Sequence, residues 1–370
     1  MKKDYDVIII CFSNPSHDAR TINLVRTLIK YQRKVALVTP DYNYEPDYIN
    51  NSDYYKCSVK LNQKVRYSQK EFTKAVKKLN LSTSFVHAGD FYSLTAAKSI
   101  KIKCKAKLIY DSREIYSQLN SLKNRPFARK LIEFREKYLV TYVDKIVVTA
   151  DVDETYLKKY FMHNIPYYTI KNLPPQQELK SSDYIRREYN IKPDSLVLLY
   201  QGWILEGRGL DSLVKAIKDL SFVELVIVGG GEYTDELKKI VGSLELENRV
   251  HFTGLIPYDH LSKITMSADV GLVLFEDTSI SYQNALPNKL FEFIQSAIPV
   301  ITTNQKTMRE VVDNENIGLV VNRLDVDELQ KAIHKLSDSN TRNYYRENIL
   351  KIRNKYNYEL QEVEILKVFS

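Results

Sequence analysis

The side chains best suited to binding or catalysis lie in the segment 281–300, where a lysine and a glutamate stand three positions apart. Pro287 suits the first turn of a helix, because its missing N–H costs nothing there. The backbone N–H groups of residues 285–288 would then be free to meet an anion, with Glu292 roughly 8 Å deeper along the helix axis. That separation suits the phosphates and the ribose hydroxyls of a nucleoside diphosphate. Taken alone, the segment is better explained as a packed helix with a solvated pair of Lys289 and Glu292.

The same segment also carries the pattern of a buried helix that runs into a strand. Four apolar residues at helical spacing form one stripe and leave the polar residues on another face; the stripe consists of Leu290, Phe293, Ile294 and Ala297. An apolar strand is expected directly after it. The helix would therefore be held in place by its apolar side, with its polar side available to a ligand.

A second segment has the order strand, glycine-rich loop, helix. The apolar residues 196–200 are followed by Gly202, then by Gly207, Arg208 and Gly209, and a helix is expected to begin near Asp211. Glycine lets a backbone approach a ligand closely, and a guanidinium pairs with phosphate oxygens in a forked geometry. As a single signal this is weak, because many turns use glycine for chain reversal alone.

Two more segments repeat this pattern, one with three glycines at 229–231 after a strand and one at residues 249–275 with two strands around a helix. Four such units in a row predict a doubly wound parallel sheet. Ligands of such sheets bind beyond the carboxyl ends of the strands, which is where these loops would lie.

In their order and spacing these motifs resemble glycosyltransferase family 4, the retaining, nucleotide-sugar-dependent enzymes of the GT-B fold. The first family motif usually reads G-R-L-x-x-x-K-G, and here Trp203 stands at the arginine and Arg208 takes the role of the lysine. The family's second motif is a pair of glutamates, of which Glu292 matches the later one and Asn284 stands at the earlier one.

The resemblance implies an α/β chain of two Rossmann-like domains that face a central cleft, and it implies the site residues. Glu292 would bind the ribose, and Arg208 and Lys289 would stabilise the charge that develops on the leaving diphosphate. Asn284 would lie near the donor sugar. The rest of the donor site is expected at Gly202, Gly209, Gly230, Ile256, Leu286, Pro287 and Asn288.

The amino-terminal half starts as such a domain would, with a strand, a polar loop, a helix and a strand in residues 6–40. Residues 13–16 would face the cleft. The resemblance places His87 and Asp90 around the transferred sugar, although Gly89 stands where the family commonly has a second histidine. Asp111, Arg113 and Glu114 would border the acceptor side.

Composition favours two domains and excludes several classes of protein. The 370 residues with 44% hydrophobic side chains suffice for two cores. No apolar run approaches the roughly 18 residues of a membrane span, and no signal peptide is expected before the first strand. Three cysteines without paired spacing argue against a disulfide framework or a metal site. A cytoplasmic protein is therefore expected.

The charge is divided unevenly along the chain. Residues 1–180 hold 32 Lys and Arg against 18 Asp and Glu, whereas residues 181–370 hold 22 against 28. The two halves therefore differ in net charge, +14 against −6, and the first half is expected to meet an anionic surface or acceptor. Within it, basic side chains alternate with apolar ones in residues 121–140, so that this segment either lies in a membrane interface or forms an ordinary solvated helix. Nucleic acid is not expected, because no recognition motif is evident.

No cofactor and no divalent metal are expected. Two D-x-D strings, which hold a metal in other sugar transferases, begin at Asp151 and Asp325. Each precedes a helical pattern, so that helix N-capping explains both. The predicted domains are an acceptor-side domain at 1–178, a nucleotide-sugar domain at 179–350, and a helix at 351–370 that packs back on the first domain.

The sequence therefore predicts a retaining glycosyltransferase that moves a sugar from a nucleoside-diphosphate sugar, UDP more than GDP. The acceptor would be a glycan or a polyprenyl-linked molecule of bacterial surface polysaccharide biosynthesis, and the enzyme would sit in the cytoplasm, in contact with the plasma membrane if the basic segment binds it. Two alternatives remain open at this point. One is a sugar-nucleotide epimerase of the same fold, and the other is a non-catalytic partner protein, to which Gly89, Trp203 and Asn284 point.

Overall fold

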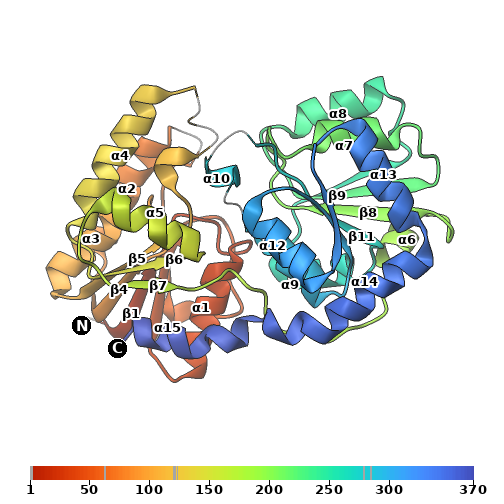
Figure 1. The fold of residues 1–370 in the computed structure, drawn as a ribbon. Coiled ribbons are helices and arrows are strands. Elements are labelled where there is room, and N and C mark those ends of the chain that lie inside the picture. Colours follow the sequence, from red (N-terminus) through yellow and green to blue (C-terminus); the bar gives the residue numbers. More distant parts are fainter. Residues whose placement is uncertain (1–2, 62–63, 120–121, 123, 278–279, 284–285) are drawn as a thin grey trace. The chain divides into compact units, whose positions relative to one another are not determined.

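The computed structural model describes residues 3–61, 64–119, 122, 124–277, 280–283 and 286–370, and of residues 280 and 281 it describes the backbone only. The chain forms two compact units (Figure 1). Residues 1–172 and 361–370 make the first unit and residues 173–360 the second. The boundaries between the units therefore lie after Asn172 and after Leu360. They were expected after residues 178 and 350.

The first unit contains a seven-stranded parallel sheet in the order β3-β2-β1-β4-β5-β6-β7. Its strands are β1 (Lys3–Ile10), β2 (Val35–Pro40), β3 (Tyr54–Cys57), β4 (Leu81–Ala88), β5 (Lys107–Ser112), β6 (Lys145–Val148) and β7 (Tyr167–Thr169). Its helices are α1 (Ala19–Lys30), α2 (Val65–Lys78), α3 (Leu94–Cys104), α4 (Pro126–Val140), α5 (Asp151–Phe161) and α15 (Glu362–Val368).

The second unit repeats this plan with six parallel strands in the order β10-β9-β8-β11-β12-β13. The strands are β8 (Leu196–Gln201), β9 (Val223–Val228), β10 (Val250–Gly254), β11 (Val270–Val273), β12 (Val300–Thr303) and β13 (Gly318–Val321). The helices are α6 (Tyr184–Glu188), α7 (Leu210–Ile217), α8 (Thr234–Ser243), α9 (Tyr258–Thr265), α10 (Ile280–Gln283), α11 (Asn288–Gln295), α12 (Lys306–Glu315), α13 (Val326–Ser337) and α14 (Ser339–Ile352).

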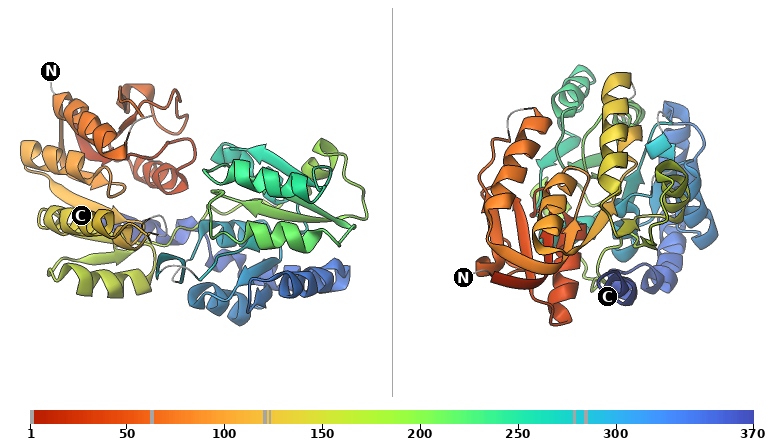
Figure 2. Two further views of the ribbon diagram at one scale, coloured as in Figure 1. Left: turned by 90° about the horizontal axis from the view of Figure 1, so that it is seen from above. Right: turned by 90° about the vertical axis from the view of Figure 1, so that its left-hand side faces the viewer.

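Helices cover both faces of each sheet (Figure 2). In the second unit, alternate residues of β8 enter two separate cores, with Leu198 and Tyr200 in the core under α7 and α13 and Val197 and Leu199 in the core under α9 and α11. All six residues of β8 are buried, as expected for a central parallel strand. The predicted α/β class with two Rossmann-like domains is confirmed.

Strand order reverses between β1 and β4 in the first unit and between β8 and β11 in the second. At such a switch point the loops that follow the two strands diverge and leave room for a ligand. Local details differ from the expectations. Pro287 stands just before α11 in an extended conformation, and α11 ends at Gln295, two residues before Ala297 with its left-handed φ of 56°. The segment that follows the expected boundary at residue 178 contains α6, and Ile185 and Ile191 are buried in the core of the second unit.

A buried ion pair ties α1 to the sheet of the first unit. Arg20 donates from Nε and Nη2 to the two carboxylate oxygens of Asp111 at 2.6 and 2.8 Å, and from Nη1 to the carbonyl of Ile170 at 2.7 Å. Burial alone would raise the pKa of Asp111, but Arg20, together with His87 and Arg113, outweighs it and holds that pKa well below its usual range. The pair therefore fixes the orientation of α1 over β5.

Replacing Arg20 with methionine should lower the free energy of unfolding of the first unit by about 3–5 kcal/mol, because Asp111 stays buried with one cation fewer. The double variant Arg20→Met, Asp111→Leu should recover a large part of this loss. Urea titrations followed by circular dichroism measure both, with the exposed Arg33→Met as control. A single variant as stable as the control would contradict the assignment.

Candidate functional site

Glycines allow the loops after β8 and β9 to pack directly against each other. Gly202 N–H donates to the carbonyl of Val228 at 2.9 Å, and Ile204 N–H donates to that of Gly230 at 3.0 Å. A Cβ atom at Gly229 would lie 1.9 Å from the carbonyl oxygen of Gly202, in a backbone with a φ of 137°. These loops consequently hold a fixed shape at the switch point of the second sheet, before any ligand binds.

Lys289, in the first turn of α11, reaches this switch point with its ammonium group. Its side chain is only 6% exposed, and its Nζ lies 3.7 Å from the centre of the Tyr200 ring and faces Gly202, where an added Cβ would be 3.8 Å away. Among the residues that the structure describes, Nζ has no hydrogen-bond partner. Burial, together with repulsion from Arg208, lowers the pKa of Lys289 well below its ordinary value, and attraction to Glu292 opposes this only in part.

Arg208 provides a second cation at the same place. Its guanidinium carbon lies 4.3 Å from the ring centre of Phe275 and 4.9 Å from that of Tyr282, so that the two rings hold the side chain from the segments after β11 and in α10. The loop that carries Arg208 is anchored by Glu276 N–H, which donates to the carbonyl of Gly207 at 2.8 Å. Within the described part of the chain, Arg208 Nε is buried without a partner. Its hydrogen-bonding capacity is therefore not used up inside the protein.

Glu292, one turn after Lys289 on α11, is oriented by an amide at the end of β8. Gln201 Nε2 donates to Glu292 Oε2, and Gln201 Oε1 accepts from Thr265 Oγ1 at 2.9 Å. Thr265 thereby determines which end of the Gln201 amide faces Glu292. Burial raises the pKa of Glu292 to about 7, although the hydrogen bond from Gln201 and the charge of Lys289 oppose the rise.

Two cations and one carboxylate thus converge at the carboxyl ends of β8 and β11, beside the first turn of α11. Unpaired cations suit a phosphate group, and a buried carboxylate that accepts hydrogen bonds suits hydroxyl groups. The arrangement can bind a molecule that carries both, such as a nucleoside diphosphate, along one side of α11.

Of the predicted donor-site residues, the structure brings together Gly202, Arg208, Lys289 and Glu292. Gly209 is the N-cap residue just before α7, has a φ of 67° and packs against Leu324. Asn284 lies outside the described residues. The remaining predicted positions are half-buried, and Pro287 and Asn288 directly precede Lys289 in the chain; the full set is Gly230, Ile256, Leu286, Pro287 and Asn288.

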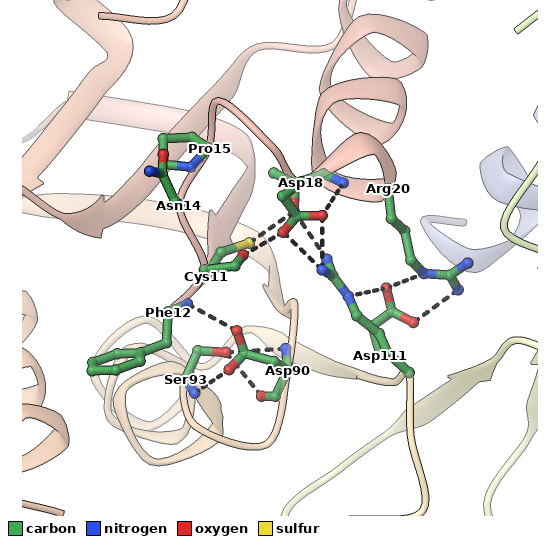
Figure 3. A network of polar contacts seen from close by, with 12 residues as sticks. Cys11, Phe12, Asn14, Pro15, Asp18, Arg20, Asp90, Ser93 and Asp111 are labelled. Carbon is green, nitrogen blue, oxygen red and sulfur yellow. Dashed lines mark hydrogen bonds and ion pairs between the residues drawn. The ribbon is translucent and has the colours of Figure 1, made fainter. Parts of the chain in front are cut away.

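In the first unit, Asp90 holds two segments together. Its carboxylate accepts from the backbone N–H of Phe12 at 2.9 Å and of Ser93 at 2.6 Å, so that it joins the loop after β1 to the start of α3 (Figure 3). His87 is 2% exposed, its Nε2 lies 3.7 Å from Asp111 Oδ2, and its ring lies 5.9 Å from that of Phe369. Burial lowers the pKa of His87, so the neutral form is favoured.

Beside Asp90, a buried ion pair fills the switch point of the first sheet. Arg113 Nη1 donates to both carboxylate oxygens of Asp18, at 2.8 and 2.7 Å, and Asp18 accepts from Thr21 N–H to cap α1 (Figure 3). Burial would raise the pKa of Asp18, but Arg113 and the hydrogen bonds from Ser13 and Thr21 together outweigh it, and the pKa is lowered. Arg113 was predicted from the sequence, whereas Asp18 was not, nor were Gln201 and Thr265 in the second unit. A polar residue that ends a fully apolar strand, as Gln201 does, was the available signal.

N-capping was predicted for both acidic strings; it is confirmed for the string at Asp325 and wrong for the string at Asp151. Asp325 caps α13, because its side chain accepts from Glu328 N–H at 2.9 Å. Asp151 is instead the first residue of α5 and makes no capping bond; it follows Ala150, and Asp153 accepts from Thr149. No group of three or more His, Cys, Asp or Glu side chains able to hold a metal ion occurs among the described residues.

The comparison with known proteins agrees with this geometry. The family model of the glycosyl transferases group 1 matches residues 181–352, which is nearly the whole second unit. This match identifies residues 181–352 as a glycosyl transferases group 1 domain. Over its full length the chain is similar to the sucrose-phosphate synthase of Thermosynechococcus elongatus (TM-score 0.77, 18% identity, 98% of each chain). It is also similar to HepE of Anabaena in complex with UDP-glucose (TM-score 0.76, 14% identity, 98% of this chain and 99% of that one). These similarities show the GT-B fold.

The matches to relatives found by sequence cover a smaller part of the chain. An uncharacterized glycosyltransferase of Methanocaldococcus jannaschii is 23% identical over 258 residues, and the match spans 66% of this chain and 64% of that relative. The lipopolysaccharide core biosynthesis glycosyltransferase LpsE of Rhizobium meliloti is 25% identical over 156 residues, which are 41% of this chain and 42% of that one. The chain thus aligns with less than two thirds of the length of these two relatives.

Replacing Lys289 with methionine should have opposite effects on stability and on binding. Removal of a buried, unpaired ammonium should raise the free energy of unfolding of the second unit by about 1–3 kcal/mol. The same change should weaken UDP binding roughly tenfold or more, since a charged hydrogen bond to phosphate is lost. Thermal unfolding and calorimetric titration measure the two quantities. The exposed Lys306→Met should change neither, and a Lys289 variant that is less stable or binds UDP equally well would refute the role.

The affinity for a UDP-sugar, whose diphosphate does not titrate near neutrality, should rise with pH through about 7, because Glu292 must be ionised to accept ribose hydroxyls. It should fall again on the alkaline limb of the profile, as the pH rises through the pKa of Lys289, which lies well below that of a free lysine. Without ligand, the raised pKa of Glu292 makes the second unit lose stability as the pH rises from 4.5 to about 7. Glu292→Gln should flatten the acidic limb and Lys289→Met the alkaline limb; unchanged limbs would count against the assignment.

Proposed function

We propose that this chain transfers a sugar from a nucleoside-diphosphate sugar, UDP more than GDP, to a glycan or a polyprenyl-linked acceptor, with retention of the anomeric configuration. The observation that carries the proposal is the buried, unpaired ammonium of Lys289 between Arg208 and Glu292 at the switch point of the second sheet. A charge in this state costs stability and is compensated when an anion binds.

The donor diphosphate would lie between Lys289 and Arg208. In the family motif an arginine and a lysine both come from the loop after the strand that corresponds to β8, but Trp203 occupies the arginine position and its side chain is 58% exposed. The ammonium of Lys289 lies next to Gly202 in the same loop. We infer that Lys289 on α11 supplies the second positive charge that Trp203 does not.

The ribose would bind to Glu292. Gln201 holds Oε2 of its carboxylate, which leaves Oε1 to accept from ribose hydroxyls. The residues expected near the sugar are less accessible, because His87 and Asp90 are buried and Asp90 is fully engaged by backbone N–H groups. For these two we propose a positioning role for the loop after β1. Asn284 remains a proposed sugar ligand.

In the proposed reaction the bond from the anomeric carbon to the diphosphate oxygen breaks and the bond to the acceptor oxygen forms on the same face of the sugar. The acceptor hydroxyl gives its proton to the departing phosphate oxygen, so that no carboxylate base is required. Lys289 and Arg208 stabilise the negative charge that grows on the leaving group, which is the largest contribution a preorganised site can make. No divalent metal is needed in this scheme, because the two cations occupy its usual place.

The proposed product belongs to a bacterial surface polysaccharide. The similarity to a lipopolysaccharide core glycosyltransferase supports this, as does the excess of positive charge in residues 1–180. No helix in the described residues is long and apolar enough to cross a membrane. Contact of the basic first unit with the membrane surface is part of the proposal.

The first test is the release of nucleoside diphosphate from a panel of UDP- and GDP-sugars, with and without a bacterial lipid extract and with EDTA present. One donor should be cleaved, the extract should accelerate the release, and EDTA should leave the rate unchanged. Glu292→Ala should lose at least about tenfold in rate, whereas the exposed Glu310→Ala should retain it. NMR of the product sugar should show the donor's anomeric configuration.

Two other results would overturn the proposal. Conversion of the donor sugar without an acceptor would indicate an epimerase. If no donor is cleaved and no nucleotide raises the unfolding temperature, the chain is a non-catalytic partner protein.

A further inference from the structure

Helix α4 exposes four large apolar side chains in a single row. Phe127, Leu131, Phe134 and Tyr138 are 89%, 65%, 73% and 51% exposed. Their spacing of four, three and four residues places them on the same side of the helix. We call these four residues the α4 stripe. A soluble surface usually scatters such residues singly, and a continuous row of them indicates an interaction site.

The stripe does not serve the packing of the first unit. The opposite side of α4 holds the helix to the domain, where Leu139 and Val140 are buried and Tyr110 donates to the buried carboxylate of Glu136 at 2.7 Å. Arg135 adds bonds to Gln69 on α2 and to Thr95 on α3. Because α4 is already anchored by these contacts, its apolar row remains available to a partner.

Positive charge surrounds the stripe. Helices α2, α3 and α4 together carry twelve Lys and Arg against three Glu and no Asp, and one of the three, Glu136, is buried. Arg129 and Lys130 are exposed next to the first residues of the stripe. At its other end, Lys98 of α3 lies 4.5 Å from the ring centre of Tyr138 and 3.5 Å from that of Tyr142. Apolar side chains flanked by cations are the pattern of a segment that lies in the interface of an anionic bilayer.

We propose that the α4 stripe inserts into the outer part of an anionic phospholipid bilayer, with the lysines and arginines of α2, α3 and α4 against the lipid phosphates. The stripe is a convex row on one helix, which suits a fluid lipid surface and offers no pocket to a protein partner. A second copy of the chain is disfavoured, because two such faces would bring like charges together. Nucleic acid would satisfy the cations but would leave the phenylalanine and leucine side chains in water.

The inference rests on one part of the proposed function, the contact of the first unit with a membrane, and it can be tested without the transfer reaction. The purified full chain is mixed with vesicles of phosphatidylglycerol and phosphatidylcholine, or of phosphatidylcholine alone, and the bound fraction is measured by flotation at low and at physiological salt. Binding should require the anionic lipid and weaken with salt. The double variant Phe127→Ser, Phe134→Ser should bind at least about tenfold more weakly.

Matched variants separate insertion from general effects. Leu360→Ser, Val363→Ser removes two apolar side chains of similar exposure, 61% and 60%, and should bind as the wild type does. Arg129→Glu, Lys130→Glu should weaken binding, whereas Lys238→Glu, Lys239→Glu on α8 should have a smaller effect. The UDP-induced rise in unfolding temperature, which reports the second unit, and the far-ultraviolet circular dichroism should be the same in all variants, so that a folding defect is recognised.

A second measurement reports insertion directly. The chain has one tryptophan, Trp203, so the emission of Phe134→Trp minus that of the wild type comes from α4. This emission should move to shorter wavelength with anionic vesicles. Equal binding by the stripe variant, or an unchanged emission, would overturn the insertion. A wild type that ignores the vesicles but forms a dimer lost in the stripe variant would overturn the membrane assignment and make the face a dimer interface.

Discussion

The ammonium of Lys289, buried against the face of Tyr200 without a hydrogen-bond partner among the described residues, is the interaction on which the candidate site depends. The cost of its burial appears in its own lowered pKa. A packed core normally removes such a group or pairs it. Here the loop beside the ammonium is packed tightly, because a Cβ atom at Gly229 would clash with the carbonyl oxygen of Gly202. An anion that enters the site satisfies the group and relieves this cost.

The two units share a topology, but the charged side chains at their switch points are paired in the first unit and largely unpaired in the second. In the first unit the switch point is filled by ion pairs that neutralise one another, Arg113 with Asp18 and Arg20 with Asp111. In the second unit Lys289 is repelled by Arg208 and attracted by one carboxylate, Glu292, whose own burial raises its pKa. A network of paired charges makes a domain more rigid. Charges without a partner remain available to bind a ligand. The second sheet is therefore the one poised for a phosphorylated ligand, although both sheets offer the same kind of crevice.

The sequence was sufficient for the class of fold and for the residues that lie on one helix or one loop. The glycine-rich loop after β8 could be predicted from the spacing of its glycines. Lys289 and Glu292 could be predicted to lie together because helix geometry relates two residues three positions apart. Contacts between distant segments could not be read in the same way. Gln201 and Thr265 are 64 positions apart, and only the register of β8 beside α9 brings them together. The end of α11 was not predicted for a similar reason. The apolar pattern continues to Ala297, but tertiary packing ends the helix at Gln295, and Ala297 has a left-handed φ.

The departures from the family motif bear on whether the proposed site is active. Trp203 removes a cation from the loop after β8, which by itself would favour a degenerate protein. Loss of function leaves no reason to keep Lys289 buried and unpaired, because replacement with an apolar residue would stabilise the domain. The lysine nevertheless stands beside Gly202, next to the motif position at which Trp203 replaces the arginine. A charge that costs stability and faces the phosphate region is the arrangement expected when binding is under selection, and it favours a compensated motif over a decayed one.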